Sequence, residues 1–329
     1  MSRHEPSLAV IIPTYRRNQD VLRALASLQE QSLPSFEVVV VDNAADRQLE
    51  QEVRSAERRA GVMVTYVAEP RLGLHNARHA GARASAADVL VYTDDDATFS
   101  PDWLASLQSA FGQHDAMAVA GGPVRAVWEK TPPDWLVKYM EGRTDFGPLS
   151  LREPHQTFVQ SADESAYGVN FAIRREVLFA LGGFNPESFG DHWLGDGESG
   201  LVRKVTDSGR LIGYVPGALV WHHVPASRMT VAYLARRMAN EGACIEYAYF
   251  RRQPPTVSRV TQRFARALAS LLLCWPRQAV LRVKGGSPAP WLDARLHWAM
   301  ACSRLSYLVR VARSAEMRGL IAKRDWLNE

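Results

Sequence analysis

Cysteine is scarce in this sequence. The 329 residues include only Cys244, Cys274 and Cys302, which lie far apart and form neither a CxxC pair nor a spacing typical of metal ligands. This pattern excludes a fold built on several disulfides and a metal site built on thiolates. We therefore expect a reducing, cytoplasmic setting.

Long apolar runs are also absent. The longest, residues 267–275, is far shorter than the roughly 20 apolar residues that a membrane-spanning helix needs. The first residues lack a basic stretch followed by a long apolar one, so we expect no secretory signal peptide. With 47% apolar residues, the chain can still form a full hydrophobic core.

Glycine is missing where some nucleotide-binding folds require it. Residues 11–20, IIPTYRRNQD, contain none, and no G-x-G-x-x-G motif follows the first apolar run. This disfavours a dinucleotide-binding fold of the dehydrogenase kind. It also disfavours a nucleotidyltransferase, in which a glycine-rich basic loop would be expected at this place.

Acidic residues are few in the last third of the chain. From Arg228 onward there are 18 Lys and Arg against 6 Asp and Glu, whereas the preceding residues hold 21 against 29. This asymmetry indicates an anionic partner for the C-terminal part. Aromatic residues are not interleaved with the basic ones as a stacking platform, so nucleic acid is not expected.

Apolar runs alternate with amphipathic segments over the first hundred residues. The first helix has Asn18 or Asp20 as a candidate N-cap. The alternation predicts an α/β fold with a mostly parallel, Rossmann-like central sheet and helices on both faces. Strands are predicted at residues 8–12, 36–42, 62–68 and 89–93. The first predicted helix follows its candidate N-cap and has Val21, Leu22, Leu25 and Leu28 as its apolar face, and further helices are predicted at residues 46–59 and 74–86.

Polar residues follow all four predicted strands. Ligands of such sheets bind beyond the carboxyl ends of the strands, so we expect these residues to converge on one edge and bind a polar ligand. In chain order they are Pro13, Thr14, Tyr15 and Arg17, then Asp42 and Asn43, then Glu69, Pro70 and Arg71, and finally Asp94, Asp95 and Asp96.

Three consecutive carboxylates end the fourth predicted strand. In an extended chain Asp94 and Asp96 point to one side and Asp95 to the other. Carboxylates about 4 Å apart repel, and Mg²⁺ or Mn²⁺ removes that cost by binding one or two of them together with phosphate oxygens. The alternative is a solvated acidic turn before a helix that has Ser100 as N-cap and Pro101 as its first residue.

Several longer stretches carry a resemblance that no single motif carries. They are VIIPTYRRNQDVLRALASLQEQ (10–31), FEVVVVDNAAD (36–46), EPRLGLHNARHAGARASAADVLVYTDDDATFSPDWL (69–104), GVNFAIRREVLFALGGFNPESFG (168–190), GDGESGLVRKVTDSG (195–209) and YVPGALVWHHVPASRMT (214–230). Their order and spacing resemble the family 2 glycosyltransferases, which have the GT-A fold. The resemblance implies an inverting, metal-dependent transfer of a sugar from a nucleotide-sugar, with UDP-sugars as the first expectation, to an acceptor hydroxyl.

The resemblance also assigns site residues by position. It places the family's DxD motif on Asp94 and Asp96, which would hold Mn²⁺ or Mg²⁺, and His222 would complete the metal site, with His223 as the competitor. The residues expected to bind the nucleotide-sugar are Pro13, Thr14, Tyr15, Arg17, Asp42, Arg71, Arg78, Asp94 and Asp95.

A catalytic base is expected in residues 193–201. The acceptor hydroxyl must lose a proton to a carboxylate on the opposite face of the sugar. Many family members carry an adjacent Glu-Asp pair before a helix, whereas here Gly197 separates Asp196 from Glu198. Alignment on the helix puts Glu198 at the base position, and Asp196 then binds the acceptor or shares the role. The alternative is simple capping of the helix N-terminus by these acids.

The C-terminal part holds two apolar stripes at helical spacing. Pro276 is predicted to end the first helix. Either both helices pack on the catalytic domain or on a second copy as a homodimer, or they form a basic amphipathic surface for an anionic membrane. The stripes are Val260, Phe264, Ala267, Leu268, Leu271, Leu272 and Trp275, and Trp298, Ala301, Cys302, Leu305, Leu308, Val309 and Ala312; Arg259, Arg263, Arg266, Arg304, Arg310 and Arg313 lie off them.

These observations predict a GT-A catalytic domain at residues 1–225 and a basic helical region at residues 226–329. The resemblance implies work in surface polysaccharide or glycolipid assembly, in the cytoplasm or peripherally at the inner face of the membrane, with a carbohydrate, lipid-linked or small-molecule acceptor. Two alternatives stay open: a nucleotidyltransferase acting on sugar phosphates, and a non-catalytic nucleotide-sugar-binding protein.

Overall fold

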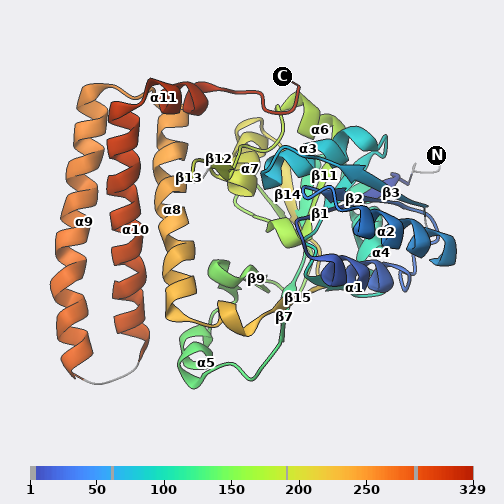
Figure 1. Cartoon of the computed structure of the whole chain (residues 1–329), viewed down its shortest axis with the longest axis horizontal. Coiled ribbons are helices and arrows are strands. Elements are labelled where there is room, and N and C mark those ends of the chain that lie inside the picture. Colours follow the sequence, from blue (N-terminus) through green and yellow to red (C-terminus); the bar gives the residue numbers. More distant parts are fainter. Residues whose placement is uncertain (1–4, 61–62, 190–191, 285–287, 329) are drawn as a thin grey trace.

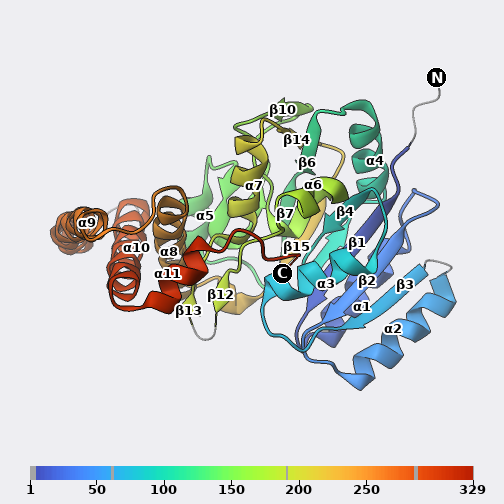
Figure 2. The same cartoon turned by 90° about the horizontal axis from the view of Figure 1, so that it is seen from above.

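An eight-stranded sheet forms the centre of the molecule (Figures 1 and 2). The computed structural model describes residues 5–60, 63–189, 192–284 and 288–328. The strands of this sheet are β1 (Leu8–Thr14), β2 (Glu37–Asp42), β3 (Met63–Ala68), β4 (Val89–Tyr92), β6 (Met117–Gly121), β10 (Val159–Ser161), β11 (Phe171–Arg174) and β14 (Leu211–Tyr214).

The sheet is mostly parallel, as predicted. Its order is β10-β14-β6-β11-β4-β1-β2-β3. Strand β1 pairs in parallel with β2 and β4, β2 with β3, and β6 with β14, whereas β10 and β11 run antiparallel to their neighbours. The first four strands therefore place their carboxyl ends along one edge.

Helices cover both faces of this sheet. Alternate side chains of β1 belong to different cores: Val10 and Ile12 pack with apolar residues of α1, α2 and α4, and Ala9 and Ile11 with those of α3, α6 and α7. Both faces are thus buried, which explains why the strand reads as a continuous apolar run. The helices are α1 (Asn18–Leu28), α2 (Arg47–Ala60), α3 (Leu74–Ala84), α4 (Trp103–Gln113), α6 (Arg175–Ala180) and α7 (Gly197–Asp207).

A smaller sheet brings β15, late in the chain, next to the three aspartates that follow β4. Its order is β5-β15-β7-β9-β8. Strand β5 starts directly after Asp96, and its antiparallel pairing with β15 sets His222 opposite Ala97. The remaining elements here are β5 (Ala97–Phe99), β7 (Val124–Trp128), α5 (Asp134–Met140), β8 (Asp145–Phe146), β9 (Leu151–Arg152), the hairpin of β12 (Ser188–Phe189) and β13 (His192–Trp193), and β15 (Val220–Val224).

Three long C-terminal helices lie side by side, with α10 between α8 and α9 and with α9 outermost (Figures 1 and 2). The C-terminal helices are α8 (Val231–Arg252), α9 (Val257–Lys284), α10 (Pro288–Arg313) and the shorter α11 (Ala315–Ala322). Packing within the chain buries Ala301 and Leu308 of the second predicted stripe, whereas Ala312 is exposed and the other members are half-buried. Among the described residues, no helix combines the length and the apolar character that crossing a membrane requires.

A buried carboxylate joins the three long helices. Glu246 of α8 is fully buried and accepts two hydrogen bonds of 2.8 Å from Arg263 of α9 and one of 2.7 Å from Arg304 of α10. Two arginines that the sequence analysis assigns to a basic outer surface are therefore turned inward. The surface is less basic than the sequence predicts.

The predicted N-caps of two helices are wrong. Helix α1 has Arg17 at its N-cap, because the Asn18 side chain donates to Asp46 and Asp20 pairs with Arg23. Helix α4 starts at Trp103, two residues later than predicted, with Asp102 as the N-cap. Residues 100–102 precede the helix, and the backbone amide of Ser100 donates a hydrogen bond to the Leu219 carbonyl.

The predicted end of the first C-terminal helix at Pro276 is also wrong. Helix α9 continues through this residue to Lys284. A proline inside a helix removes one backbone hydrogen bond and costs about 3 kcal/mol. A helix of 28 residues that packs along α10 retains its other backbone bonds and this packing, which offset that cost.

Candidate active site

A cavity of about 410 Å³ lies beyond the carboxyl ends of β1 and β4. The predicted convergence of strand ends occurs here, although the part after β3 is supplied by Leu72, Gly73 and Leu74 and not by Glu69 or Arg71. The lining residues are Pro13, Thr14, Tyr15, Arg17, Asn43, Leu72, Gly73, Leu74, Asp94, Asp95, Asp96 and Arg228.

Asp95 is anchored to the first strand end. Its carboxylate accepts a 2.8 Å hydrogen bond from the Thr14 hydroxyl and a 2.9 Å bond from the Arg17 guanidinium. Burial raises the pKa of Asp95 to about 6, although Arg17 and Thr14 act in the opposite direction. Asp95 thereby ties β1 to the turn that follows β4.

Asp96 lies within reach of three cationic or polar side chains. Its Oδ2 accepts bonds from Arg17 at 3.1 Å and Arg228 at 2.8 Å, and its Oδ1 lies 3.5 Å from His222 Nε2. Burial raises the pKa of Asp96, but the His222, Arg228 and Arg17 contacts outweigh it and hold the pKa below its usual range. The predicted alternation is wrong here, because a turn at Asp95 and Asp96 lets one arginine reach both carboxylates.

His222 is held in one tautomer. Its Nδ1 lies 2.9 Å from the Leu149 carbonyl oxygen, which can only accept, so Nδ1 carries the proton. Its Nε2 is therefore unprotonated, and the Nε2 lone pair accepts a 2.8 Å hydrogen bond from Arg228. His223 instead points away along β15 and bonds to the Thr98 hydroxyl. Of the two histidines, His222 is the one that faces Asp96.

The chemistry of these groups fits a divalent cation. The buried Oδ1 of Asp96 has no hydrogen-bond partner, and the lone pair of His222 Nε2 lies beside it. Within the described ranges, no group of three or more His, Cys, Asp and Glu side chains could hold a metal. Two protein ligands and the oxygens of a bound diphosphate are a common set for Mg²⁺ and Mn²⁺. The assignment of these ligands stays a prediction.

Arg78 links the cavity to a second group of carboxylates. It is 1% exposed and donates to Glu187 at 2.9 Å and to Glu198 at 2.6 Å. Asp94, half-buried in the cavity wall, lies within electrostatic range of it. Burial raises the pKa of Asp94, and Arg78 partly opposes this shift. Arg78 therefore lies below the cavity and does not line it.

Glu187 is a site residue that the sequence analysis missed. Burial raises its pKa to about 8, with Arg78 acting against this and Glu198 adding to it. Burial thus favours the protonated form of Glu187, whereas the same guanidinium favours the ionised form of Glu198. Its partner Arg78 is 109 residues away in the chain, and no local pattern signals such a contact.

Gly197 explains the unusual spacing of the two predicted catalytic acids. Its φ of +41° suits glycine, and a Cβ there would lie 2.6 Å from Glu187 Oε1. Gly168 is equally constrained, since a Cβ there would lie 1.9 Å from Glu198 Oε1. The backbone therefore approaches both glutamates at positions where a side chain would displace them.

Asp196 and Glu198 differ in what surrounds them. The Asp196 side chain is 2% exposed, and its two oxygens accept from Asn185 at 2.7 Å and from Arg203. The Glu198 side chain is 26% exposed, and Arg78 lowers its pKa against the effect of burial. Neither side chain caps α7. Glu198 is thus the one that an acceptor can reach.

Besides Arg78, two further residues expected to bind the nucleotide-sugar lie off the cavity wall. Asp42 is fully buried and accepts from the backbone amides of Ala44 and Asp46 and from the Tyr66 hydroxyl. Arg71 is turned to Glu69, with which it forms a bidentate pair. Their contact with a nucleotide stays a prediction.

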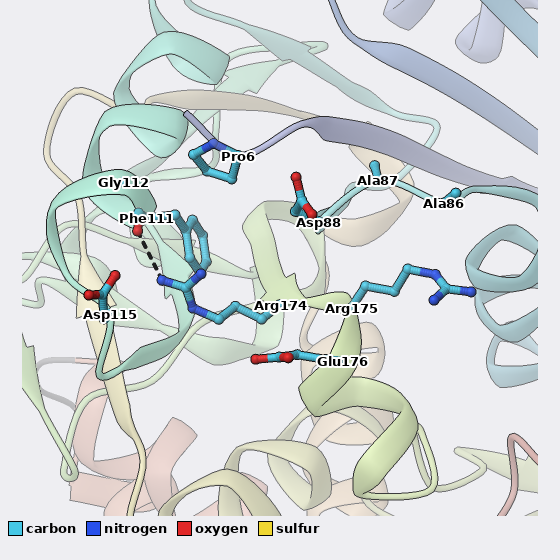
Figure 3. A pocket seen from close by; sticks show the side chains of 10 residues that line it. All are labelled: Pro6, Ala86, Ala87, Asp88, Phe111, Gly112, Asp115, Arg174, Arg175 and Glu176. Atoms are coloured by element: carbon cyan, nitrogen blue, oxygen red, sulfur yellow. Dashed lines mark hydrogen bonds between the residues drawn. The ribbon is translucent and has the colours of Figure 1, made fainter. Parts of the chain in front are cut away.

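A larger cleft, of about 540 Å³, lies at the opposite end of the sheet (Figure 3). It is bordered by Asp88, which precedes β4, and by Arg174 at the end of the antiparallel β11. Arg174 points to the backbone and donates to the carbonyls of Phe111, His114 and Met117. This cleft contains none of the residues that the sequence singles out, so its size does not make it the site.

Comparison with known proteins places this geometry in a family. The family model described as "Glycosyl transferase family 2" matches residues 9–181. The chain is 28% identical over 273 residues to the succinoglycan biosynthesis protein ExoM of Rhizobium meliloti, covering 81% of this chain and 84% of that protein. It is 24% identical over 243 residues to a glucosyl-dolichyl phosphate glucuronosyltransferase of Haloferax volcanii, covering 71% and 75%.

The fold has solved counterparts. One is a mannosyltransferase of Pyrobaculum calidifontis in complex with GDP-Man and Mn²⁺, with a TM-score of 0.53 and 22% sequence identity. The match covers 97% of this chain and 79% of that chain, so it includes the C-terminal helical region as well as the sheet domain.

Proposed function

This chain belongs to glycosyl transferase family 2 and is a glycosyltransferase, and we propose that it transfers a sugar from a nucleotide-sugar to an acceptor hydroxyl with inversion at the anomeric carbon. The observation that carries the proposal is the arrangement of Asp96, which lines the 410 Å³ cavity, and His222 beside it: a carboxylate oxygen without a hydrogen-bond partner lies 3.5 Å from an imidazole nitrogen whose lone pair faces it. Family membership does not favour the nucleotidyltransferase alternative.

The donor binds in this cavity. The exposed ring of Tyr15 and the backbone of Pro13 and Thr14 line the side where the base lies, and the arginines Arg17 and Arg228 lie nearest the diphosphate. Asp96 and His222, together with Asp94, would hold Mn²⁺ or Mg²⁺. When bound, the cation neutralises charge that builds on the leaving diphosphate.

The transfer is a single displacement. The acceptor oxygen forms a bond to the anomeric carbon as the bond from that carbon to the diphosphate oxygen breaks, and the nucleoside diphosphate leaves with the electron pair. Glu198 takes the proton of the acceptor hydroxyl, because it is partly exposed and Arg78 favours its ionised form, whereas burial favours the protonated form of Glu187 and Asp196 is held by Asn185 and Arg203. Arg78 orients Glu198 for this step.

The acceptor class follows from the relatives. One is named for succinoglycan biosynthesis and another for transfer onto a glucosylated dolichyl phosphate. By this similarity, the acceptor is a carbohydrate that is being extended, free or lipid-linked, and the protein acts in polysaccharide or glycolipid assembly on the cytoplasmic side. The domain division at residue 225 remains part of this proposal, with α8 as the first element of the helical region.

Donor binding is tested by thermal shift against UDP-, GDP-, CMP- and dTDP-sugars, each with Mn²⁺, Mg²⁺ or EDTA. We expect one nucleotide to raise the melting temperature only when metal is present. A ligand at 100 times its Kd stabilises the native state by about 2.7 kcal/mol. The variant Asp96→Asn should lose the metal-dependent part of the increase in melting temperature, since it removes one negative charge next to the cation.

The matched control for this test is Asp88→Asn, which removes a carboxylate bordering the other cleft. It should bind the donor like the wild type. Equal shifts in EDTA and in Mn²⁺ would contradict the metal-dependent site, and no shift with any nucleotide would contradict donor binding itself.

Helix α9 is proposed to touch an anionic membrane surface. Its outward face exposes Phe264, Leu268, Leu272 and Leu273 at 36%, 38%, 64% and 74%, and Arg266 is exposed beside them. An apolar strip flanked by basic residues on the outermost helix suits the headgroup region of a membrane that carries a lipid-linked acceptor.

Sedimentation with vesicles tests this surface. We expect binding to vesicles that contain phosphatidylglycerol, weaker binding at high salt, and little binding to phosphatidylcholine alone. The double variant Leu268→Glu and Leu272→Glu should abolish it, whereas Met63→Glu, at an exposed apolar residue of β3, should not. Equal sedimentation of the protein with both vesicle types would contradict the proposal. If the wild type instead has the mass of a dimer in solution and the double variant has the mass of a monomer, the exposed face of α9 is a homodimer interface.

A further inference from the structure

Arg228 occupies a particular place among the candidate metal ligands. One of its guanidinium nitrogens donates to Asp96 Oδ2 at 2.8 Å, and another donates to His222 Nε2 at 2.8 Å. It therefore binds two of the three groups that would hold the cation, Asp96 and His222 but not Asp94. Arg17, which divides its bonds between Asp95 and Asp96, binds only one of them.

The bond from Arg228 to His222 uses the same electrons that a cation would use. The lone pair of His222 Nε2 cannot accept from a guanidinium and coordinate a metal at once, because Nδ1 already carries the ring proton. A divalent ion next to Asp96 would also repel the positive charge of Arg228. Binding of the cation therefore requires Arg228 to leave its present partners.

The surroundings allow that movement. Arg228 belongs to a short 3-10 helix (Ala226–Arg228) directly after β15, and its side chain is 18% exposed. It lines the donor cavity and also a neighbouring cavity of about 350 Å³, which shares Arg17, Asp96 and Arg228 with the first. The side chain thus stands between two open spaces and does not lie within a packed core.

We propose that Arg228 fills the cation's place at Asp96 and His222 in the free enzyme, and that it gives up this place only when a nucleoside diphosphate offers its guanidinium a new anionic partner. The inference rests on the proposed function. It makes Arg228 a positioning residue that couples the binding of the cation to the binding of the nucleotide: each ligand alone binds weakly, and the two together bind well.

The test measures Mn²⁺ binding to the full chain without nucleotide, by the loss of the free Mn²⁺ electron paramagnetic resonance signal. Arg228→Ala should bind Mn²⁺ at least about tenfold more tightly than the wild type, since neither a competing bond to His222 nor a positive charge beside Asp96 then opposes the cation. Arg228→Lys can bond to only one of the two partners at a time, so its affinity for Mn²⁺ should lie between those of the wild type and Arg228→Ala. This variant also provides the test if the alanine variant does not fold.

The matched control is Arg23→Ala. Arg23 lines the neighbouring cavity but pairs with Asp20 and not with Asp96. Arg23→Ala also removes one positive charge near the site, so it measures the general electrostatic effect of that loss on Mn²⁺ binding. We expect the affinity for Mn²⁺ to change by less than about twofold. Tightening by Arg23→Ala equal to that of Arg228→Ala would overturn the inference.

A second measurement separates coupling from simple competition. In the wild type, saturating UDP or GDP should strengthen Mn²⁺ binding, and in Arg228→Ala this gain should shrink by about tenfold. If the wild type binds Mn²⁺ and Arg228→Ala binds it no more tightly, Arg228 does not hold the cation's place and the inference alone fails. If no variant binds Mn²⁺ with or without nucleotide, the metal-dependent function fails with it.

Discussion

Replacing Glu198 with Gln is expected to lower the rate of sugar transfer by about 10²–10⁴-fold, the usual contribution of a general base. Gln keeps the size of the side chain and can still accept the 2.6 Å bond from Arg78, but it cannot take the acceptor's proton. Donor binding, read by the metal-dependent thermal shift, should be unchanged. The rate is measured as release of nucleoside diphosphate, with water or a screened carbohydrate as the acceptor.

Asp196→Asn is the control for this prediction. Asp196 is buried and held by Asn185 and Arg203, so its replacement should lower the melting temperature while leaving much of the activity of the folded enzyme. Transfer by Glu198→Gln at the wild-type rate would refute the assignment of the base. Loss of transfer in Asp196→Asn at full stability would move the role to Asp196.

The second large effect concerns stability. Glu246→Ala should destabilise the helical region by about 3–5 kcal/mol, the usual result of breaking a buried ion pair from one side. The substitution leaves Arg263 and Arg304, whose side chains are 12% and 13% exposed, without their carboxylate. Denaturant unfolding followed by circular dichroism measures the loss, and a separate early transition would report the helices alone.

An exposed ion pair between α8 and α7 provides the control. Arg252 pairs with Asp207, but the two side chains are 61% and 60% exposed. Asp207→Ala should therefore cost less than about 1 kcal/mol. Replacing Glu246, Arg263 and Arg304 together by apolar residues should recover most of the lost stability, since no buried charge then remains unpaired. A cost for Glu246→Ala as small as that for Asp207→Ala would show that the buried triad does not hold the helices.

Local patterns in the sequence were sufficient for the architecture. Apolar runs such as residues 8–12 predict buried strands, and their alternation with amphipathic segments predicts a parallel sheet covered on both faces. Once the sheet is known, the ends of its strands must meet, which is why Thr14, Arg17, Asp95 and Asp96 could be assigned to one cavity before the structure.

Boundaries were less predictable. The side chains of Asn18 and Asp20 suit an N-cap, yet each has a partner elsewhere, and Pro276 suits a helix end, yet α9 continues through it. For Asn18 and Pro276 a tertiary contact overrides a preference worth about 1–3 kcal/mol, whereas Asp20 is used by Arg23 on the same helix. Such contacts are not visible in a single stretch of sequence.

By itself, then, the sequence determined the order of the first four strands and the helices between them, the edge at which the site lies and the presence of three carboxylates there, because each of these depends on residues close together in the chain. Only the tertiary structure decided that His222 and not His223 faces Asp96, that Glu187 and Glu198 share Arg78, and that Arg263 and Arg304 turn inward to Glu246. These are pairings of charged and polar groups that lie up to 126 residues apart in the chain, the separation of His222 from Asp96. Their formation follows from burial, since a charge removed from water requires a partner and folding determines which one lies within reach.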